Sequence, residues 1–122
     1  MARAVVDTSA VVGYLERGEK TLKDAMEMFS EVIIPLEVVF ETVYVLEGMY
    51  GRERVEIFSW LTSLLDHPKL VYDRQVILNT LFRYRDRKNL SVVDCYVLEL
   101  ASEGKCELVT VDEKMMKAFA AR

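Results

Sequence analysis

The sequence predicts an α/β protein built around a parallel β-sheet. Short apolar runs alternate along the chain with longer segments in which apolar residues recur every three or four positions. The runs suit strands that are buried on both faces, and the longer segments suit amphipathic helices. Because parallel strands are joined by crossovers that usually contain a helix, this alternation predicts a sheet covered by helices on both faces.

Four apolar runs are expected to form the strands of this sheet. Each is a short run of mainly apolar residues, and the second run is closed by Pro35, which disfavours continuation. The runs cover residues 4–6, 32–34, 70–72 and 108–111.

Seven segments are expected to form helices between and after these strands. The first follows Ser9, a predicted N-cap, and stops at Gly18, while the sixth stops at Gly104. The helical segments cover residues 10–17, 21–29, 36–49, 53–65, 74–87, 92–103 and 113–121.

Composition indicates one globular domain over residues 1–122. Hydrophobic residues make up 52% of the chain and charged residues 30%, which is typical of a folded protein rather than a disordered one. No apolar run approaches the roughly 20 residues of a membrane span. The run before Asp7 is shorter than the apolar region of a secretory signal, so we expect no membrane association and a cytoplasmic location.

Cysteine, histidine and net charge exclude several kinds of function. Cys95 and Cys106 form no CxxC pair, which argues against a zinc site, and His67 is the chain's one histidine, which leaves little basis for a Ser/His/Asp mechanism. The net charge of −4 argues against a simple DNA-binding module. It argues less against a metal-dependent nuclease, because clustered carboxylates add negative charge that bound cations offset.

Four acidic residues stand where the chemistry of such a sheet is expected. Ligands of open parallel sheets bind outside the carboxyl ends of the strands, and Asp7 and Asp112 each directly follow a predicted strand. Asp94 lies near the start of a predicted helix, and Glu41 lies within a helix among apolar neighbours, where a cation would offset the cost of burying its charge. The four acids together favour a shared metal site.

Each acid also has a purely structural interpretation. Asp94 can form a capping box with Ser91, and Asp112 can cap the last helix. Asp7 can form a turn with Thr8 and Ser9, and Glu41 can point to solvent.

Three stretches resemble PIN domains, especially the VapC-like toxin ribonucleases of VapBC toxin–antitoxin pairs. "VVDTSA" at residues 5–10 resembles the opening motif of the family, and "PLEVVFETVYVL" at 35–46 resembles its second motif. "LSVVDCYVLELASEGKCELVTVDEKM" at 90–115 resembles the third and fourth, which end in Thr-x-Asp. Their order and spacing match over almost the whole chain.

The resemblance implies a three-layer αβα sandwich with a central parallel sheet of about four or five short strands. It implies a Mg²⁺- or Mn²⁺-dependent endoribonuclease, a homodimer in many members, inhibited by a protein antitoxin. The family's acidic quartet, both metal-binding and catalytic, falls on Asp7, Glu41, Asp94 and Asp112. Its supporting polar residues fall on Ser9 and Thr110.

RNA also has to be held near the acids. Basic residues cluster just before the Asp94 helix and are candidates for phosphate contacts: Arg83, Arg85, Arg87 and Lys88. The alternative is an exposed helix end, where cations suit the helix dipole. For the whole chain, the alternative to a ribonuclease is a catalytically weak PIN-like binding or scaffold module that retains a metal site.

Overall fold

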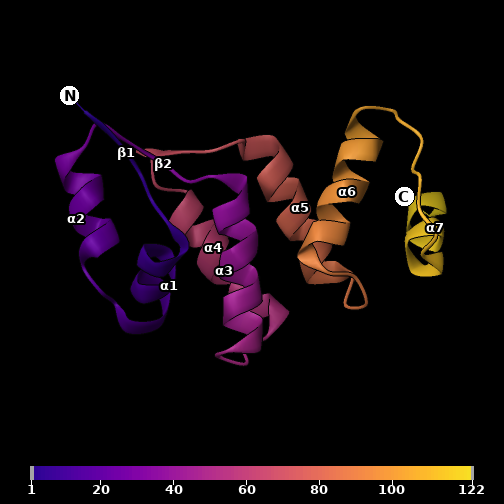
Figure 1. Ribbon diagram of the computed structural model, residues 1–122, viewed down its shortest axis with the longest axis horizontal. Helices are drawn as coiled ribbons and strands as arrows, with labels where there is room; N and C mark the ends of the chain where they lie inside the picture. The colour runs from indigo at the N-terminus through magenta and orange to yellow at the C-terminus, as the bar shows by residue number, and fades with distance from the viewer. Residues whose placement is uncertain (1, 122) are drawn as a thin grey trace. The chain divides into compact units, whose positions relative to one another are not determined.

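The computed structural model describes residues 2–121 and contains a three-stranded parallel sheet flanked by helices (Figure 1). The strands are β1 (Arg3–Val5), β2 (Glu31–Ile33) and β3 (Leu70–Val71), in the order β1-β2-β3. Val5 lies opposite Ile33, and Ile33 lies opposite Val71. The carboxyl ends of the three strands therefore meet at one edge of the sheet.

The predicted helices are all present, and their bounds lie within two residues of the expected ones. Capping and amphipathic periodicity are local properties, so they predict these elements well. The helices are α1 (Thr8–Arg17), α2 (Thr21–Met28), α3 (Leu36–Gly48), α4 (Arg54–Leu65), α5 (Arg74–Asp86), α6 (Val92–Glu103) and α7 (Glu113–Ala120).

The chain divides into two compact units, Met1–Arg74 and Gln75–Arg122, called unit 1 and unit 2 below. Unit 1 holds the sheet and the first four helices, and α5 begins at its last residue. The predicted single domain over residues 1–122 stays a prediction.

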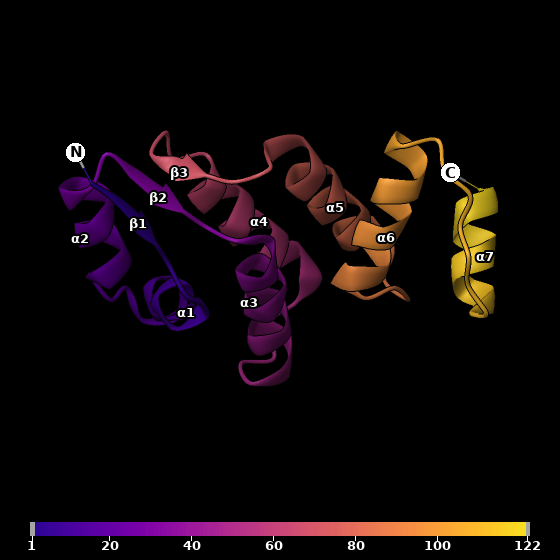
Figure 2. The same ribbon diagram turned by 45° about the horizontal axis from the view of Figure 1, so that its top comes forward.

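The core of unit 1 lies among β2, α1, α3 and α4. The helix α1 packs against α2 and α3, and α3 packs against α4 (Figure 2). Fully buried side chains from these elements include Val11, Val32, Val43, Leu46 and Leu61. Val43, Leu46 and Leu61 lie on the faces that the apolar periodicity predicts to be buried in α3 and α4. Val55, which the same periodicity places on the buried face of α4, is instead 64% exposed.

The helix α1 begins two residues earlier than the sequence predicts. Asp7, rather than Ser9, is the N-cap, with an extended φ of −102° and ψ of 174°. At the other end Gly18 adopts the left-handed conformation with a φ of 63°, as a C-terminal glycine is expected to do. Both ends of α1 are thus specified by residues that lie next to it in the sequence.

The predicted fourth strand at residues 108–111 is absent from the structure. This segment forms neither helix nor strand, and Val109 and Val111 are 96% and 98% exposed. The prediction relied on a short apolar run, but a strand exists only where another strand supplies its hydrogen bonds. The three strands observed are therefore fewer than the four or five expected.

Unit 2 is helical over the residues described. Fully buried side chains on α5 and α6 include Leu81, Tyr84 and Leu98. The carboxylate of Glu99 joins these two helices, because it accepts hydrogen bonds from Asn79 at 3.0 Å and from Arg83 at 2.9 Å. The last helix, α7, packs against α6. Across residues 2–121, no helix is long and apolar enough to span a membrane.

Candidate functional site

Asp7 stands at the carboxyl end of β1 and caps helix α1. Its Oδ1 accepts hydrogen bonds from the Ser9 hydroxyl at 2.8 Å and from the Ala10 amide at 3.3 Å. The Ser9 hydroxyl, and then the Ala10 amide, hold the pKa of the Asp7 carboxyl below its ordinary value. The side chain is exposed. Asp7 is therefore an ionised, solvent-accessible carboxylate at the sheet edge where ligands bind.

Glu41 is joined to the beginning of α1 by a hydrogen bond from Thr8. The Thr8 hydroxyl donates to Oε1 of Glu41 across the interface of α1 and α3. Since Thr8 follows Asp7 directly, this bond connects Glu41 to the segment that holds the first aspartate. Glu41 is exposed, so its charge carries no burial cost, contrary to the argument from its apolar sequence neighbours. The helix turns this position to solvent while Val39 and Val43 face the core.

Asp94 takes part in a capping box at the start of α6. Its Oδ2 accepts from the Ser91 amide at 3.1 Å, and the Ser91 hydroxyl accepts from the Asp94 amide at 3.0 Å. This arrangement is the structural alternative that the Ser-x-x-Asp spacing suggested. The bonds engage one of the two carboxylate oxygens, and an ionised carboxylate has about four lone-pair sites. Capping and cation binding are thus compatible at Asp94.

Asp112 caps helix α7 in a similar way. Its Oδ1 accepts from the amides of Lys114 at 2.8 Å and Met115 at 3.2 Å. The Thr110 hydroxyl accepts from the Asp112 amide at 3.0 Å, so the Thr-x-Asp sequence forms a local turn. Asp112 is exposed and follows the unpaired segment 108–111 rather than a strand. The prediction that it stands at a strand end is wrong because that strand does not form.

The four candidate acids are divided between the two units. Asp7 and Glu41 belong to unit 1, while Asp94 and Asp112 belong to unit 2. Across residues 2–121, no group of three or more His, Cys, Asp or Glu side chains is arranged to hold a metal ion. What the structure does bring together is Glu41 and Thr8, the residue that directly follows Asp7. The shared quartet stays a prediction.

The candidate RNA-binding cations lie at the end of α5 and in the turn that follows it. Arg83 forms its ion pair with Glu99, whose side chain is only 3% exposed, so this guanidinium is part of the packing of α5 against α6. Arg85 pairs with Asp86 at 2.8 Å and lies over the ring of Phe82. Lys88 is exposed, and Arg87 is half-buried. Contact between any of these four residues and RNA stays a prediction.

A groove of about 320 Å³ runs between α1 and α3 and begins at Glu41, while Asp7 lines a separate pocket with residues of β1 and α2. Thr8, Ser9 and Glu41 line one end, and Arg17 and Tyr50 line the other. Its remaining lining residues are the apolar side chains Val12, Val45 and Met49. Glu41 and the space beside it are therefore continuous with a groove that ends at a guanidinium group.

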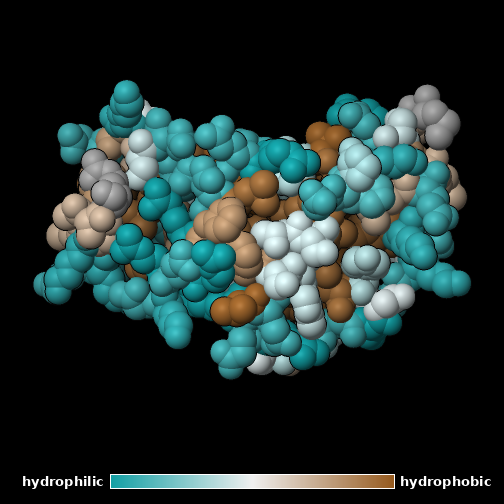
Figure 3. Space-filling view, turned by 180° about the vertical axis from the view of Figure 1, so that it is seen from behind, coloured by the Kyte–Doolittle hydropathy of each residue, from teal (hydrophilic) through white to brown (hydrophobic). Residues whose placement is uncertain are grey.

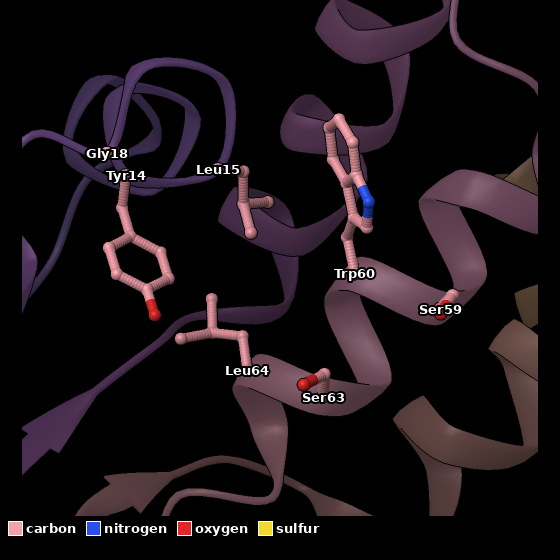
Figure 4. Close-up of a pocket in the computed structure, with 7 residues that line it drawn as sticks. All are labelled: Tyr14, Leu15, Gly18, Ser59, Trp60, Ser63 and Leu64. Carbon is pink, nitrogen blue, oxygen red and sulfur yellow. The ribbon is translucent and has the colours of Figure 1, made fainter.

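A second groove, of about 450 Å³, lies on the α4 side of α1 (Figure 4). In the close-up, Tyr14 of α1 and Leu64 of α4 point toward one another, and Trp60 stands beside them. No carboxylate lines this groove, so it lacks the ligands for metal-dependent hydrolysis. On the face shown in Figure 3, hydrophobic side chains are exposed in separate patches between hydrophilic ones.

Together these observations define an α/β protein with exposed carboxylates at the edge of a small parallel sheet. A family model for the PIN domain matches residues 4–121, which is nearly the whole chain. The chain belongs to the PIN-domain family. PIN domains are generally nucleases and typically use divalent metal ions. The comparisons with curated proteins and with solved structures each give no match.

Sequence reasoning missed two features of the site region. One is the hydrogen bond of Thr8 to Glu41, although Thr8 was visible as the polar neighbour of Asp7. The other is Arg17, whose Nη1 donates to the Tyr50 hydroxyl at 2.6 Å. Both pairs join residues 33 positions apart, and no local pattern indicates which residues of two such helices meet.

Proposed function

We propose that this PIN domain is a metal-dependent endoribonuclease that hydrolyses RNA phosphodiester bonds. The observation that carries the proposal is Asp7, an exposed carboxylate with a lowered pKa at the carboxyl end of β1. Thr8, the next residue, donates a hydrogen bond to Glu41. In this proposal Asp7, Glu41, Asp94 and Asp112 form the site, which the resemblance of all four motifs to the family's quartet supports.

The donor groups of these residues fit Mg²⁺ or Mn²⁺. All four side chains supply carboxylate oxygens, the hard ligands that both ions accept. In Asp7, Asp94 and Asp112 the capping bonds engage a single oxygen, which leaves the second oxygen for a cation. We propose that Asp7 and Asp94 hold the principal ion, with Asp112 assisting and Glu41 binding a second ion or orienting the attacking water.

The residues around the acids have separate roles in the proposed reaction. When bound, the divalent ion activates water and offsets the charge that builds up on the phosphoryl oxygens. The Ser9 hydroxyl keeps Asp7 ionised, and the Thr8 hydroxyl fixes the direction of the Glu41 carboxylate. Thr110 orients the turn before Asp112. Pre-organised carboxylates of this kind cost less reorganisation as the reaction proceeds.

We further propose that the protein is the toxin of a toxin–antitoxin pair of the VapBC kind. The support is the resemblance of residues 5–10, 35–46 and 90–115 to the motifs of those toxins. The proposal includes a cytoplasmic location, a homodimer and an inhibitory protein antitoxin. Induced expression should then arrest growth of a bacterial host, and an Asp7→Asn variant expressed to the same level should not.

Cleavage of RNA by the purified chain tests the enzyme directly. A pool of structured RNAs and DNA of matching sequence are incubated with Mg²⁺, Mn²⁺ or EDTA. We expect cleavage of RNA that requires metal. In Asp7→Asn and in Asp94→Asn the cleavage rate should fall more than about 100-fold, a larger loss than substitution of a residue that only supports the metal ligands causes. Asp24→Asn, which alters an exposed acid on α2, is the matched control.

The other outcomes of this assay identify the alternatives. Cleavage that survives both substitutions would exclude the proposed site. Cleavage of DNA as well as RNA would leave a nuclease without the proposed preference. Metal binding that depends on Asp7 and Asp94 without any cleavage would favour the binding or scaffold module.

A further inference from the structure

The helices α1 and α3 run side by side in the same direction within unit 1. Thr8 at the beginning of α1 bonds to Glu41, and Arg17 at its end bonds to Tyr50, with the same separation of 33 residues. The two helices pack against each other. At 1.5 Å per residue, Arg17 lies about 13 Å along α1 from Thr8. The groove between the helices therefore extends well beyond the candidate acids.

The lining of this groove suits a single nucleic-acid strand. Its middle is apolar, with Val12 and Val45, and Met49 beside it is 78% exposed. Such side chains suit the faces of bases and sugars, while an aromatic ring such as that of Tyr50 offers a stacking surface. Arg17 is the one cationic side chain among the residues that line the groove. Because unit 1 as a whole carries more acidic than basic side chains, a phosphate in this groove would bind at Arg17.

Arg17 is held in place but keeps donors to spare. Nη1 donates to the Tyr50 hydroxyl at 2.6 Å, and Nε donates to Oε1 of Glu19 at 2.5 Å. A guanidinium group has five N–H donors, and it matches a phosphate as well as it matches a carboxylate. Both partners of the Arg17–Glu19 pair are about half exposed, and an exposed pair of this kind contributes little to stability. Glu19 therefore occupies a position that a phosphate can take over.

The Arg17–Glu19 pair lies over Gly13 of α1. A Cβ at Gly13 would collide with the carboxylate of Glu19 and would approach Arg17. Gly13 is buried within α1, so its bare backbone makes room for the ion pair over the helix. The position of Arg17 is thus set by its bonds to Glu19 and Tyr50.

We propose that the groove between α1 and α3 holds the RNA strand to one side of the bond that is cut, and that Arg17, positioned by Tyr50, binds a backbone phosphate there. This inference rests on the proposed ribonuclease, because it places the strand in line with Glu41 and Thr8. Glu19 covers the guanidinium in the absence of RNA and is displaced when the phosphate binds.

The test measures binding of a fluorescein-labelled pool of short single-stranded RNAs of random sequence to the full chain. Fluorescence anisotropy is recorded in EDTA, which prevents metal-dependent turnover, over a series of salt concentrations. We expect Arg17→Ala to weaken binding about 3- to 10-fold and to reduce the slope of log K against log salt by about 0.7, as the loss of one phosphate contact to a single strand does. Arg17→Lys should retain the slope.

Two further variants separate this role from a folding defect. Glu19→Gln removes the competing carboxylate and should tighten binding about 2-fold, a gain that an unfolded protein would not show. Arg3→Ala is the matched control, because Arg3 is an exposed arginine in an exposed pair with Glu31 and lies outside the groove. Its affinity and salt slope should equal those of the unmodified chain.

Parallel cleavage assays in Mg²⁺ and Mn²⁺ distinguish failure of this inference from failure of the nuclease. If the unmodified chain cleaves RNA with metal, and Arg17→Ala binds RNA with an unchanged Kd and salt slope, the proposed role of the groove is wrong and the proposed nuclease stands. Binding that depends on Arg17 without any cleavage would support the groove and count against the nuclease. Absence of RNA binding by the unmodified chain would overturn the inference.

Discussion

At the scale of single residues, the local environment of each aspartate is set by the start of a helix. Asp7, Asp94 and Asp112 each accept backbone or hydroxyl hydrogen bonds there. Such bonds fix the direction of each carboxylate, and at Asp7 the Ser9 hydroxyl and the Ala10 amide also lower the pKa. The capping bonds engage one oxygen of each carboxylate, so they leave the other oxygen for a cation.

Ser9→Ala should raise the pKa of Asp7 toward its ordinary value of 3.8, because the Ser9 hydroxyl is the largest cause of the lowering. Since the folded pKa is lowered, ionised Asp7 contributes stability that is present above the unfolded pKa and lost as the pH falls through the folded pKa. Ser9→Ala should make that acid-dependent loss smaller. Carboxyl NMR titration measures the pKa, and Ser59→Ala, at an exposed serine of α4, is the control. An unchanged Asp7 titration in Ser9→Ala would contradict this account.

Thr42 is the buried neighbour of Glu41 on α3. It is 0% exposed, and its hydroxyl finds no hydrogen-bond partner among residues 2–121. Thr42→Val replaces this hydroxyl by a methyl group of similar shape, so it should raise the free energy of unfolding by about 1 kcal/mol. Urea denaturation measures the change. Thr42→Ser, which keeps the hydroxyl and removes the methyl group, should instead destabilise; a loss of stability in both variants would count against the unpaired hydroxyl.

At the scale of elements, the ends of the helices follow from residues near each end. Gly18 ends α1 in the left-handed conformation, and Ser91 with Asp94 begins α6. The extended segment before α7 behaves differently. The apolar run at residues 108–111 predicts a strand, but Val109 and Val111 are exposed to solvent and no strand among residues 2–121 pairs with this segment. Strand formation requires pairing with distant residues, so composition alone does not decide it.

The contact between α5 and α6 depends on the buried Glu99. Glu99→Ala should lower the free energy of unfolding by about 3 kcal/mol, because it leaves Arg83 without its carboxylate in a mostly buried position. Glu103→Ala, at an exposed glutamate on the same helix, is the matched control and should change stability little. Denaturant unfolding followed by circular dichroism gives both values. Equal effects of the two variants would show that the Glu99 ion pair adds nothing.

At the scale of the whole molecule, the candidate acids come from both compact units. Metal-dependent hydrolysis by the proposed quartet requires them to act together, whereas separate capping roles do not. Titration with Mn²⁺ separates these cases, because residues that hold the same ion are not additive in their effects.

Asp7→Asn and Asp94→Asn should each remove most of the affinity for Mn²⁺, and the double variant should lose little more. Isothermal titration calorimetry on the full chain measures the three affinities, with Asp24→Asn as the control on an exposed acid. Losses that add in the double variant would indicate two independent sites, and the proposed quartet would then be wrong.

The sequence by itself determined the order of helices and strands, the bounds of the seven helices, three of the strands and the motifs of the family. These follow from amphipathic spacing, glycines and capping residues, all of which act within a few positions of one another. Only the tertiary structure decided that Thr8 meets Glu41, that Arg17 meets Tyr50, and that Val109 and Val111 stay exposed. The physical reason is that these outcomes depend on how elements far apart in the chain pack and pair, which no local pattern encodes.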